Sequence, residues 1–223
     1  MAKVISISNQ KGGVGKTVLT ALTATALAKD YQKQVLVLDV DKQQNLFDAR
    51  QEDLLIFDER HFPYPVQSVD IRHLADHLLK VVDHYDVVLI DMPGRADDAS
   101  IVELLMLCDG VLVPLVSDKN DRYGTIGFVD MLAEVRISLK EEGQELVVFG
   151  VVNQAAGRSE EKFMEEFCQS IGIEVFESRL SRRAIYSRYN TYTSYVSEGG
   201  YEVKPVHEEF SRYMDEFVNR FKI

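Results

Sequence analysis

Seven consecutive residues near the start of the chain have the types and the spacing that bind phosphate groups. The run Lys11 to Thr17 reads Lys-Gly-Gly-Val-Gly-Lys-Thr, and its three glycines let the backbone curve around a triphosphate with several N–H donors pointing inward. Lys16 is then placed to reach the β- and γ-phosphates, and the hydroxyl of Thr17 to take a magnesium position. The residues that we expect to contact the nucleotide are Gly12, Gly13, Val14, Gly15, Lys16, Thr17 and Val18.

The residues on either side of this loop indicate a strand before it and a helix after it. The run Val4 to Ser8 is typical of a buried strand, and the segment from Lys16 to Lys29 is typical of a helix. A helix that begins at the loop adds the positive end of its dipole to the phosphate site. The alternative is a glycine turn that joins strand to helix and binds no ligand, but it does not account for the spacing and for both lysines.

Two further apolar runs end in aspartates. Val35 to Leu38 is followed by Asp39 and Asp41, and Val87 to Ile90 is followed by Asp91. Because the carboxyl ends of the strands of an open α/β sheet face its ligand side, we expect these carboxylates to lie beside the phosphate loop. Asp91 is then predicted to hold a water of the Mg²⁺ shell. The alternative for Asp39 and Asp41 is that they end a strand and cap the segment after it.

One departure from the usual phosphate-loop pattern is informative. The usual pattern has a glycine five residues before Gly15, where this chain has Gln10, and a second lysine, Lys11, follows it. In this feature the loop resembles the deviant Walker A loop of the ParA/MinD family of ATPases. The resemblance implies that Lys11 reaches the nucleotide bound by the opposite subunit, and so that the chain forms a homodimer with ATP and Mg²⁺.

The same resemblance implies roles for residues outside the loop. Residues 39–45 resemble the family's first switch, the stretch Asp-x-Asp-Pro-Gln-x-Asn, with Lys42 where proline is usual. By that match Asp41 orients the attacking water and Asp39 helps to hold the magnesium shell. Asn153, which follows another predicted strand, reads the adenine edge by this resemblance, since a side-chain amide offers one donor and one acceptor; a turn-forming asparagine is the alternative.

Length and composition indicate one α/β domain over residues 1–223. Hydrophobic residues make up 46% and charged residues 27%, an ordinary globular composition. Buried strands alternate with helical stretches, so we expect a mostly parallel, twisted sheet flanked by helices on both faces, as in P-loop NTPases. No apolar run is long enough to cross a bilayer and the chain enters a strand at once, which predicts a cytoplasmic protein.

Between these motifs the sequence gives a coarser outline. Prolines at 63 and 65 are expected to break any regular element. The family resemblance implies a second switch at the Pro93-Gly94 turn and a loop at the dimer face over 118–124. The remaining expected elements are helices near 71–81, over 99–107 and up to about 140, with strands over 110–116 and 146–152.

A basic stretch from Ser178 to Ser197 stands out in a chain whose net charge is −11. It has no acidic residue, and a tyrosine recurs at every third position from Tyr186 to Tyr195. Guanidinium groups suit phosphate oxygens and tyrosines can donate to phosphates or stack, which predicts nonspecific DNA binding by this patch. Arginines paired with acidic neighbours and tyrosines packed on a helix are the alternative. The candidate DNA-binding residues are Arg179, Arg182, Arg183 and Arg188.

The end of the chain bears on membrane binding. From Phe210 to Phe221 apolar residues recur at helical spacing, and acidic residues are mixed with basic ones beside them. Anionic lipid would repel such a helix, so we expect it to dock on the core rather than on a membrane.

These features together predict a small ParA-like partition ATPase without an N-terminal DNA-binding domain. Its ATP-bound dimer is expected to bind DNA nonspecifically and to release it after slow hydrolysis stimulated by a ParB-like or other partner. The work would be partitioning of a plasmid, chromosome or mobile element, with the protein associated with the nucleoid. A MinD-like membrane-associated positioning ATPase and an ATP-dependent metabolic enzyme on the same fold are the alternatives.

Overall fold

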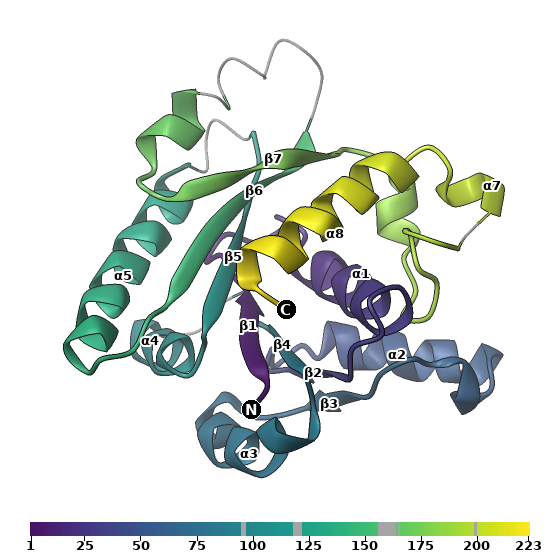
Figure 1. The fold of residues 1–223 in the computed structure, drawn as a ribbon, viewed down its shortest axis with the longest axis horizontal. Helices are drawn as coiled ribbons and strands as arrows, with labels where there is room; N and C mark the ends of the chain where they lie inside the picture. Colours follow the sequence, from purple (N-terminus) through teal and green to yellow (C-terminus); the bar gives the residue numbers. More distant parts are fainter. Residues whose placement is uncertain (95–96, 118–121, 156–163, 165, 199) are drawn as a thin grey trace.

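A seven-stranded sheet forms the centre of the computed structural model, which describes residues 1–94, 97–117, 122–155, 164, 166–198 and 200–223 (Figure 1). The strand order is β3-β2-β4-β1-β5-β6-β7, and every neighbouring pair runs parallel. The predicted α/β class is therefore confirmed. The strands are β1 (Lys3–Ile7), β2 (Val35–Asp39), β3 (Val66–Ser68), β4 (Val87–Asp91), β5 (Gly110–Leu115), β6 (Val147–Ala155) and β7 (Glu174–Ser181).

Helices cover both faces of this sheet, as predicted (Figure 1). On one face pack α1 (Lys16–Lys29), α2 (Asn45–Ile56) and α8 (His207–Phe221). On the other face pack α3 (Leu74–Val81), α4 (Asp98–Met106) and α5 (Arg122–Glu141). The short helices are η1 (Glu59–His61), η2 (Ile71–His73), η3 (Val82–His84), η4 (Ala184–Arg188) and α7 (Gly200–Val203).

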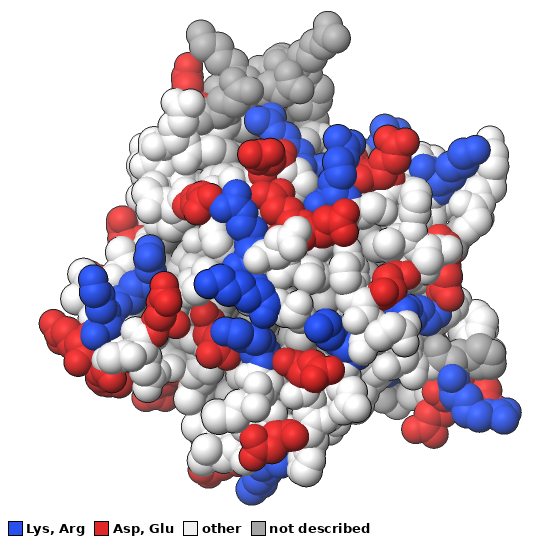
Figure 2. All heavy atoms as spheres, in the orientation of Figure 1, with Lys and Arg blue, Asp and Glu red and all other residues white. Residues whose placement is uncertain are grey.

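The last helix, α8, lies on the core, in agreement with its amphipathic sequence. Phe210, Tyr213 and Phe217 are fully buried, and the Tyr213 hydroxyl lies 2.9 Å from the Thr23 hydroxyl of α1. On the surface, acidic and basic side chains are interspersed over the face that α8 crosses (Figure 2). None of the helices that the structure describes combines the length and the hydropathy needed to cross a bilayer.

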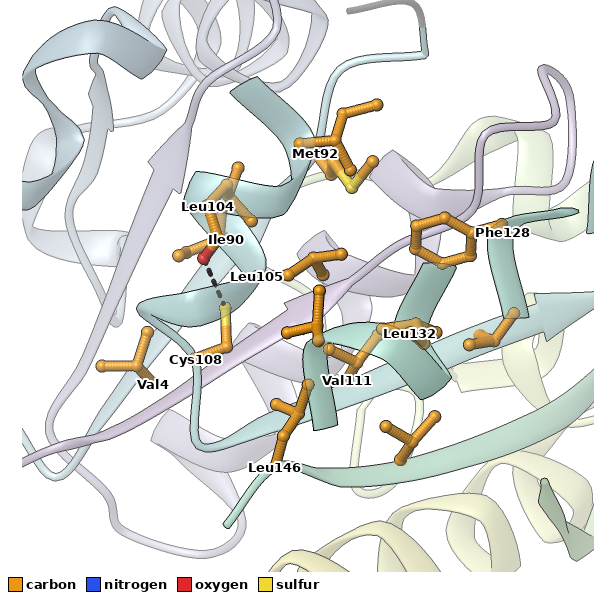
Figure 3. Packing of buried hydrophobic residues seen from close by; sticks show 14 of the residues in the cluster. Val4, Ile90, Met92, Leu104, Leu105, Cys108, Val111, Phe128, Leu132 and Leu146 are labelled. Carbon is orange, nitrogen blue, oxygen red and sulfur yellow. Dashed lines mark hydrogen bonds between the residues drawn. The ribbon is translucent and has the colours of Figure 1, made fainter. Parts of the chain in front are cut away.

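The sheet is buried on both sides because its strands are apolar at successive positions. In β2, Val35 and Val37 point to the core under α1 and α8, whereas Leu36 and Leu38 point to the opposite core. The second core is filled by α4 and α5 residues packed against β4 and β5, with the Cys108 thiol donating to the Leu104 carbonyl (Figure 3). These two layers fix the strand ends that carry the candidate site.

Two strands and one boundary differ from the sequence prediction. The edge strand β3 is only three residues long and half-buried, and the other edge strand β7 alternates polar with apolar residues, so neither has the continuous apolar signal of the central strands. The strand β6 continues past Val152 to Ala155, which places Asn153 within the strand rather than after it. Of the loop predicted over 118–124, residues 118–121 lie outside the described part of the chain.

Candidate nucleotide site

The predicted site residues meet at the carboxyl edge of the sheet. Ile7, the last residue of β1, is paired with Asp91 of β4, and Asp91 is paired in turn with Asp39 of β2. In the strand order, β4 and β2 lie on one side of β1 and β5 lies on the other, so the direction of winding reverses at β1. Open α/β sheets bind their ligands at such a position. The loop from Lys11 to Thr17 begins at this point.

Glycine is required at two positions of the loop. Gly13 and Gly15 have φ angles of 74° and 90°, in the left-handed region that favours glycine. At Gly15 a Cβ atom would also lie 2.5 Å from the Nδ2 atom of Asn153. Gly15 is the N-cap of α1 and supplies no side-chain cap, so the first turn of α1 presents its N–H groups to an anion.

Lys16 directs its ammonium group into the curve of the loop. The side chain is buried, and Nζ donates to the Lys11 carbonyl at 3.1 Å. Burial lowers the pKa of Lys16, while the charges of Asp91 and Asp41 oppose that shift. A cation is thus held beside both aspartates, where the terminal phosphates of a bound nucleotide would lie.

Thr17 and Asp91 fit a magnesium site. Asp91 is 1% exposed, the Thr17 hydroxyl donates to its carboxylate, and its Oδ1 has no hydrogen-bond partner. Across the described residues only one other buried side-chain oxygen, in Ser178, lacks a partner. Burial and then the charge of Asp39 raise the pKa of Asp91 to about 8, and a dication nearby would favour the ionised form.

Asp39 makes the contacts of a capping residue. Its carboxylate is fully buried and accepts from the backbone N–H groups of Asp41 at 3.1 Å and of Leu46 and Phe47 at 3.0 Å each. The last two donors belong to the first turn of α2, so Asp39 caps this helix, as the alternative from the sequence supposed. Burial raises the pKa of Asp39 against these three hydrogen bonds. A place in the magnesium shell stays a prediction.

Asp41 joins the two predicted switch segments. Its Oδ1 accepts from the Gln43 N–H at 2.9 Å, and its Oδ2 accepts from the Gly94 N–H at 3.0 Å. The neighbouring residue, Lys42, is exposed. The carboxylate therefore spans the end of β2 and the turn after β4, on the same edge as Lys16.

Asn153 and Gln154 support the loop from β6. The Asn153 amide donates to the Val14 carbonyl at 2.7 Å, and the Gln154 amide donates to the Gly13 carbonyl at 2.8 Å. Gln154 was not predicted from the sequence, although its position next to Asn153 could have indicated a contact with the loop. A cavity of about 450 Å³ opens here, lined among others by Gly15, Val18, Asn153, Arg182 and Tyr186.

A comparison with known families agrees with this geometry. Residues 5–192 match the family model described as the CobQ/CobB/MinD/ParA nucleotide binding domain. The chain belongs to this family. The resemblance inferred from Lys11 and Lys16 is therefore confirmed.

The proteins that this chain resembles have names that refer to several functions. The maintenance of carboxysome distribution protein A of Halothiobacillus neapolitanus is 22% identical over 223 residues, 97% of each chain. A Borrelia burgdorferi plasmid partition protein bound to AMPPNP matches with a TM-score of 0.67 at 17% identity, over 96% of this chain and 99% of that one. Cobyrinic acid a,c-diamide synthase from Mycobacterium smegmatis, bound to an ATP analogue and magnesium, matches with a TM-score of 0.71 at 17% identity, over 100% and 96%. The structural matches show a shared fold.

The arginines predicted to bind DNA are all exposed, but the tyrosines among them are not available as expected. The Tyr186 hydroxyl donates to Glu209 of α8, Tyr192 stacks on Phe57 at 4.2 Å between ring centroids, and Tyr195 is buried. For Tyr186, Tyr192 and Tyr195 the structure therefore fits the alternative that the sequence left open, in which these tyrosines pack within the protein. Binding of DNA by this patch stays a prediction. Arg182 and Arg183 line the cavity beside the loop, Arg179 lies on β7 and Arg188 ends η4.

A buried arginine that the sequence did not indicate ties α2 to this segment. Arg50 is 5% exposed and donates to the Thr191 hydroxyl at 2.8 Å, the Thr191 carbonyl at 3.2 Å and the Tyr64 carbonyl at 2.6 Å. Its guanidinium lies over the rings of Phe62 and Tyr64, and Asp53 accepts from the Thr191 N–H and hydroxyl. Since Asp39 caps the same helix, α2 connects the first switch to the arginine-bearing segment.

Proposed function

We propose that this CobQ/CobB/MinD/ParA family member is a ParA-like ATPase that works as an ATP-dependent dimer switch. One observation carries the proposal: an uncapped helix N-terminus, a buried lysine, an unpartnered buried carboxylate oxygen and an aspartate bonded to a turn converge on one sheet edge. The match of residues 5–192 and the ATP-analogue complexes of two fold neighbours support it.

In this proposal each residue has a distinct task. The backbone of the loop and Lys16 would bind the phosphates, and Thr17 and Asp91 would hold Mg²⁺, which would neutralise phosphate charge. Asp41 orients the attacking water, since its carboxylate lies at the turn that would adjoin the γ-phosphate. Asn153 contacts the base, because it lines the cavity that begins at Gly15.

Lys11 provides the test of the dimer. The proposal assigns it to the nucleotide of the opposite subunit, so ATP rather than ADP should hold two chains together. We expect sedimentation of the wild-type protein to show a dimer in a slowly hydrolysed ATP analogue and a monomer in ADP. Lys11→Ala should still bind nucleotide but should dimerise in the analogue about tenfold more weakly, because both crossing contacts are lost. Lys29→Ala, at the end of α1, is the matched control. A Lys11→Ala protein that dimerises as readily as the control contradicts the assignment.

Nonspecific DNA binding by the dimer is the second part of the proposal. The exposed side chains of Arg179, Arg182, Arg183 and Arg188 support it, and each dimer would present them twice. The interspersed charges of Figure 2 and the net charge of −11 restrict such binding to a local patch. A gel shift on an arbitrary duplex in ATP, ADP and no nucleotide tests it, and equal binding in all three contradicts the coupling.

The cargo and partner can be proposed by class. A ParB-like or other partner that stimulates hydrolysis would release the dimer from the nucleoid and so position a plasmid, chromosome or mobile element. The relative named for carboxysome distribution, which matches over 97% of both chains, adds carboxysomes to this class of cargo. The buried apolar face of α8 favours this function over membrane positioning.

A metabolic enzyme on the same fold is the second candidate, because the cobyrinic acid a,c-diamide synthase shares it over the whole chain. The two functions differ in what stimulates turnover. ATP hydrolysis that depends on a small carboxylate substrate, with no effect of DNA or a protein partner, would favour the enzyme; stimulation by DNA or a partner alone favours the switch.

A further inference from the structure

Asn9, just before the phosphate loop, is a fully buried polar residue with its whole amide engaged. Its Oδ1 accepts from the Lys11 N–H at 3.0 Å. Its Nδ2 donates to the Pro114 carbonyl at 2.9 Å and to the Thr125 hydroxyl at 3.1 Å. One side chain therefore joins the end of β1, the first residue of the loop, the end of β5 and the first turn of α5.

The bond to Pro114 continues the sheet after the backbone has left it. The Ser8 N–H donates to the Leu112 carbonyl, and β1 then turns into the loop. The next carbonyl of β5 on this side belongs to Pro114, and the Asn9 amide takes it in place of a backbone N–H. The start of the loop is thus fixed to the central sheet by a side chain.

The bond to Lys11 fixes the direction in which the chain leaves that anchor. An asparagine that accepts from the N–H two residues later closes a local turn, which limits the backbone angles of the residues inside it. Lys11 itself is half-exposed, and a long flexible stem separates its ammonium from its backbone. The space that this ammonium can reach depends on where the backbone stands, and that position depends on Asn9.

We propose that Asn9 is the positioning residue for Lys11, and that it acts on the nucleotide site of the opposite subunit rather than on its own. This inference rests on the proposed function, in which Lys11 crosses the dimer. It predicts that Asn9→Ala keeps nucleotide binding by one chain, because the side chains of Lys16 and Thr17 and the glycines of the loop are all retained. It also predicts that the rate of hydrolysis falls at least about tenfold, because Lys11 is displaced.

Mixing variants separates the two subunits. Asp41→Ala should be inactive in its own site but should still offer Lys11 to a partner. In a mixed dimer with Asn9→Ala, the Asn9→Ala subunit keeps its own Asp41 and receives an intact Lys11. Two inactive proteins should therefore regain turnover on mixing, up to about a quarter of the wild-type rate when half of the dimers are mixed and each has one working site. The measurement is single-turnover ATP hydrolysis over a range of mixing ratios.

The same mixture with Lys11→Ala in place of Asn9→Ala is the control for the proposed function. Recovery in both mixtures supports the inference. Recovery with Lys11→Ala but not with Asn9→Ala means that Asn9 serves its own subunit, which overturns the inference and leaves the proposed function intact. No recovery with Lys11→Ala overturns the crossing of Lys11, and the role of Asn9 falls with it.

A milder variant guards against a simple folding defect. Asn9→Ser keeps an acceptor for the Lys11 N–H in a serine turn but cannot reach the Pro114 carbonyl. We expect its turnover to lie between those of wild type and Asn9→Ala, with the same recovery on mixing. Two outcomes overturn the inference. The first is wild-type turnover by Asn9→Ala alone. The second is an Asn9→Ser protein that is as inactive as Asn9→Ala and that does not regain turnover on mixing.

Discussion

The phosphate-loop edge and the stretch from Ser178 to Ser197 both stand out in the sequence, but the helix end and carboxylate of the edge differ from the tyrosines of the stretch in how far the protein itself engages them. At the edge, the first turn of α1 has no side-chain cap and the Oδ1 atom of Asp91 has no partner. In the stretch, the Tyr186 hydroxyl donates to Glu209 and the Tyr195 hydroxyl donates to the Ile185 carbonyl. Groups left available around the phosphate loop favour a ligand, whereas the two tyrosine hydroxyls engaged within the protein favour a structural role for those tyrosines.

This contrast separates stability from function in the molecule. A buried cation such as Lys16, whose pKa burial lowers, is expected to add little to the stability of the chain, as a group that serves a ligand would. A buried cation such as Arg50, with three hydrogen bonds and two aromatic faces, holds α2 to the end of the stretch. Substitution of Lys16 should therefore lower ATP turnover more than stability, and substitution of Arg50 should lower stability more than ATP turnover.

The largest effect is expected for Lys16→Ala. Removal of the ammonium takes away a charge-assisted contact to the phosphates, so kcat/KM for ATP should fall by roughly a thousandfold, about 4 kcal/mol. The free energy of unfolding should hardly change, because the lost group is a desolvated charge. Steady-state ATPase kinetics and urea unfolding give the two numbers. Lys29→Ala, on the same helix and ion-paired with Glu198 at the surface, should change neither; a comparable loss of ATP turnover in it would contradict the contrast.

Much of this edge could be predicted because its signals are local. The spacing of Lys11, Lys16 and the glycines lies within one short run, and Asp39 and Asp91 each end a continuous apolar strand. Parallel strands place all such ends on one edge, whatever their distance in sequence. The meeting of these residues beside the phosphate loop is a consequence of that rule.

The residues that were missed depend on distant partners. Asn9 bonds to Pro114, 105 positions away, while Gln154 bonds to Gly13 and Arg50 to Thr191, each 141 positions away. Nothing local in the sequence states which carbonyl or hydroxyl such a side chain will meet. The packing of the tyrosines could not be predicted for the same reason, since their spacing was visible in the sequence but their partners, Phe57 and Glu209, were not.

An intermediate effect is expected for Arg50→Met, which should have the reverse profile of Lys16→Ala. Methionine fills a similar length between Phe62 and Tyr64 but leaves the buried carbonyls of Tyr64 and Thr191 without their donor. The free energy of unfolding should fall by about 2 kcal/mol, with ATP affinity of the folded protein unchanged. Urea unfolding measures the first and nucleotide titration the second.

The matched control for Arg50→Met is Arg212→Met on the exposed side of α8, where the lost contact is a single bond to the Glu208 carbonyl. It should cost less than about 0.5 kcal/mol. If the two variants are equally stable, the hydrogen bonds from Arg50 of α2 to Thr191 contribute nothing to stability. The stretch would then not have the structural role proposed for it.

The smallest effect is expected for the double variant Arg182→Ala with Arg183→Ala, and it sharpens the contrast within the stretch itself. These two side chains are exposed, whereas the neighbouring tyrosines pack within the protein, so the arginines can still contact a ligand. DNA affinity of the ATP-bound protein should fall about fivefold, and the slope of log affinity against log salt should shrink by about 2 if both contact phosphates. Stability and ATP turnover without DNA should stay as in wild type.

Arg60→Ala with Arg72→Ala removes the same charge from two exposed arginines that pair with Asp58 and Asp70. Net charge changes equally in both double variants, so a difference between them reports position rather than charge. If the two double variants have equal slopes of log DNA affinity against log salt, the arginines of the stretch, like its tyrosines, have a structural role only. A loss of ATP turnover confined to the Arg182 and Arg183 variant would instead assign these arginines to the cavity beside Gly15, and so to the nucleotide edge rather than to DNA.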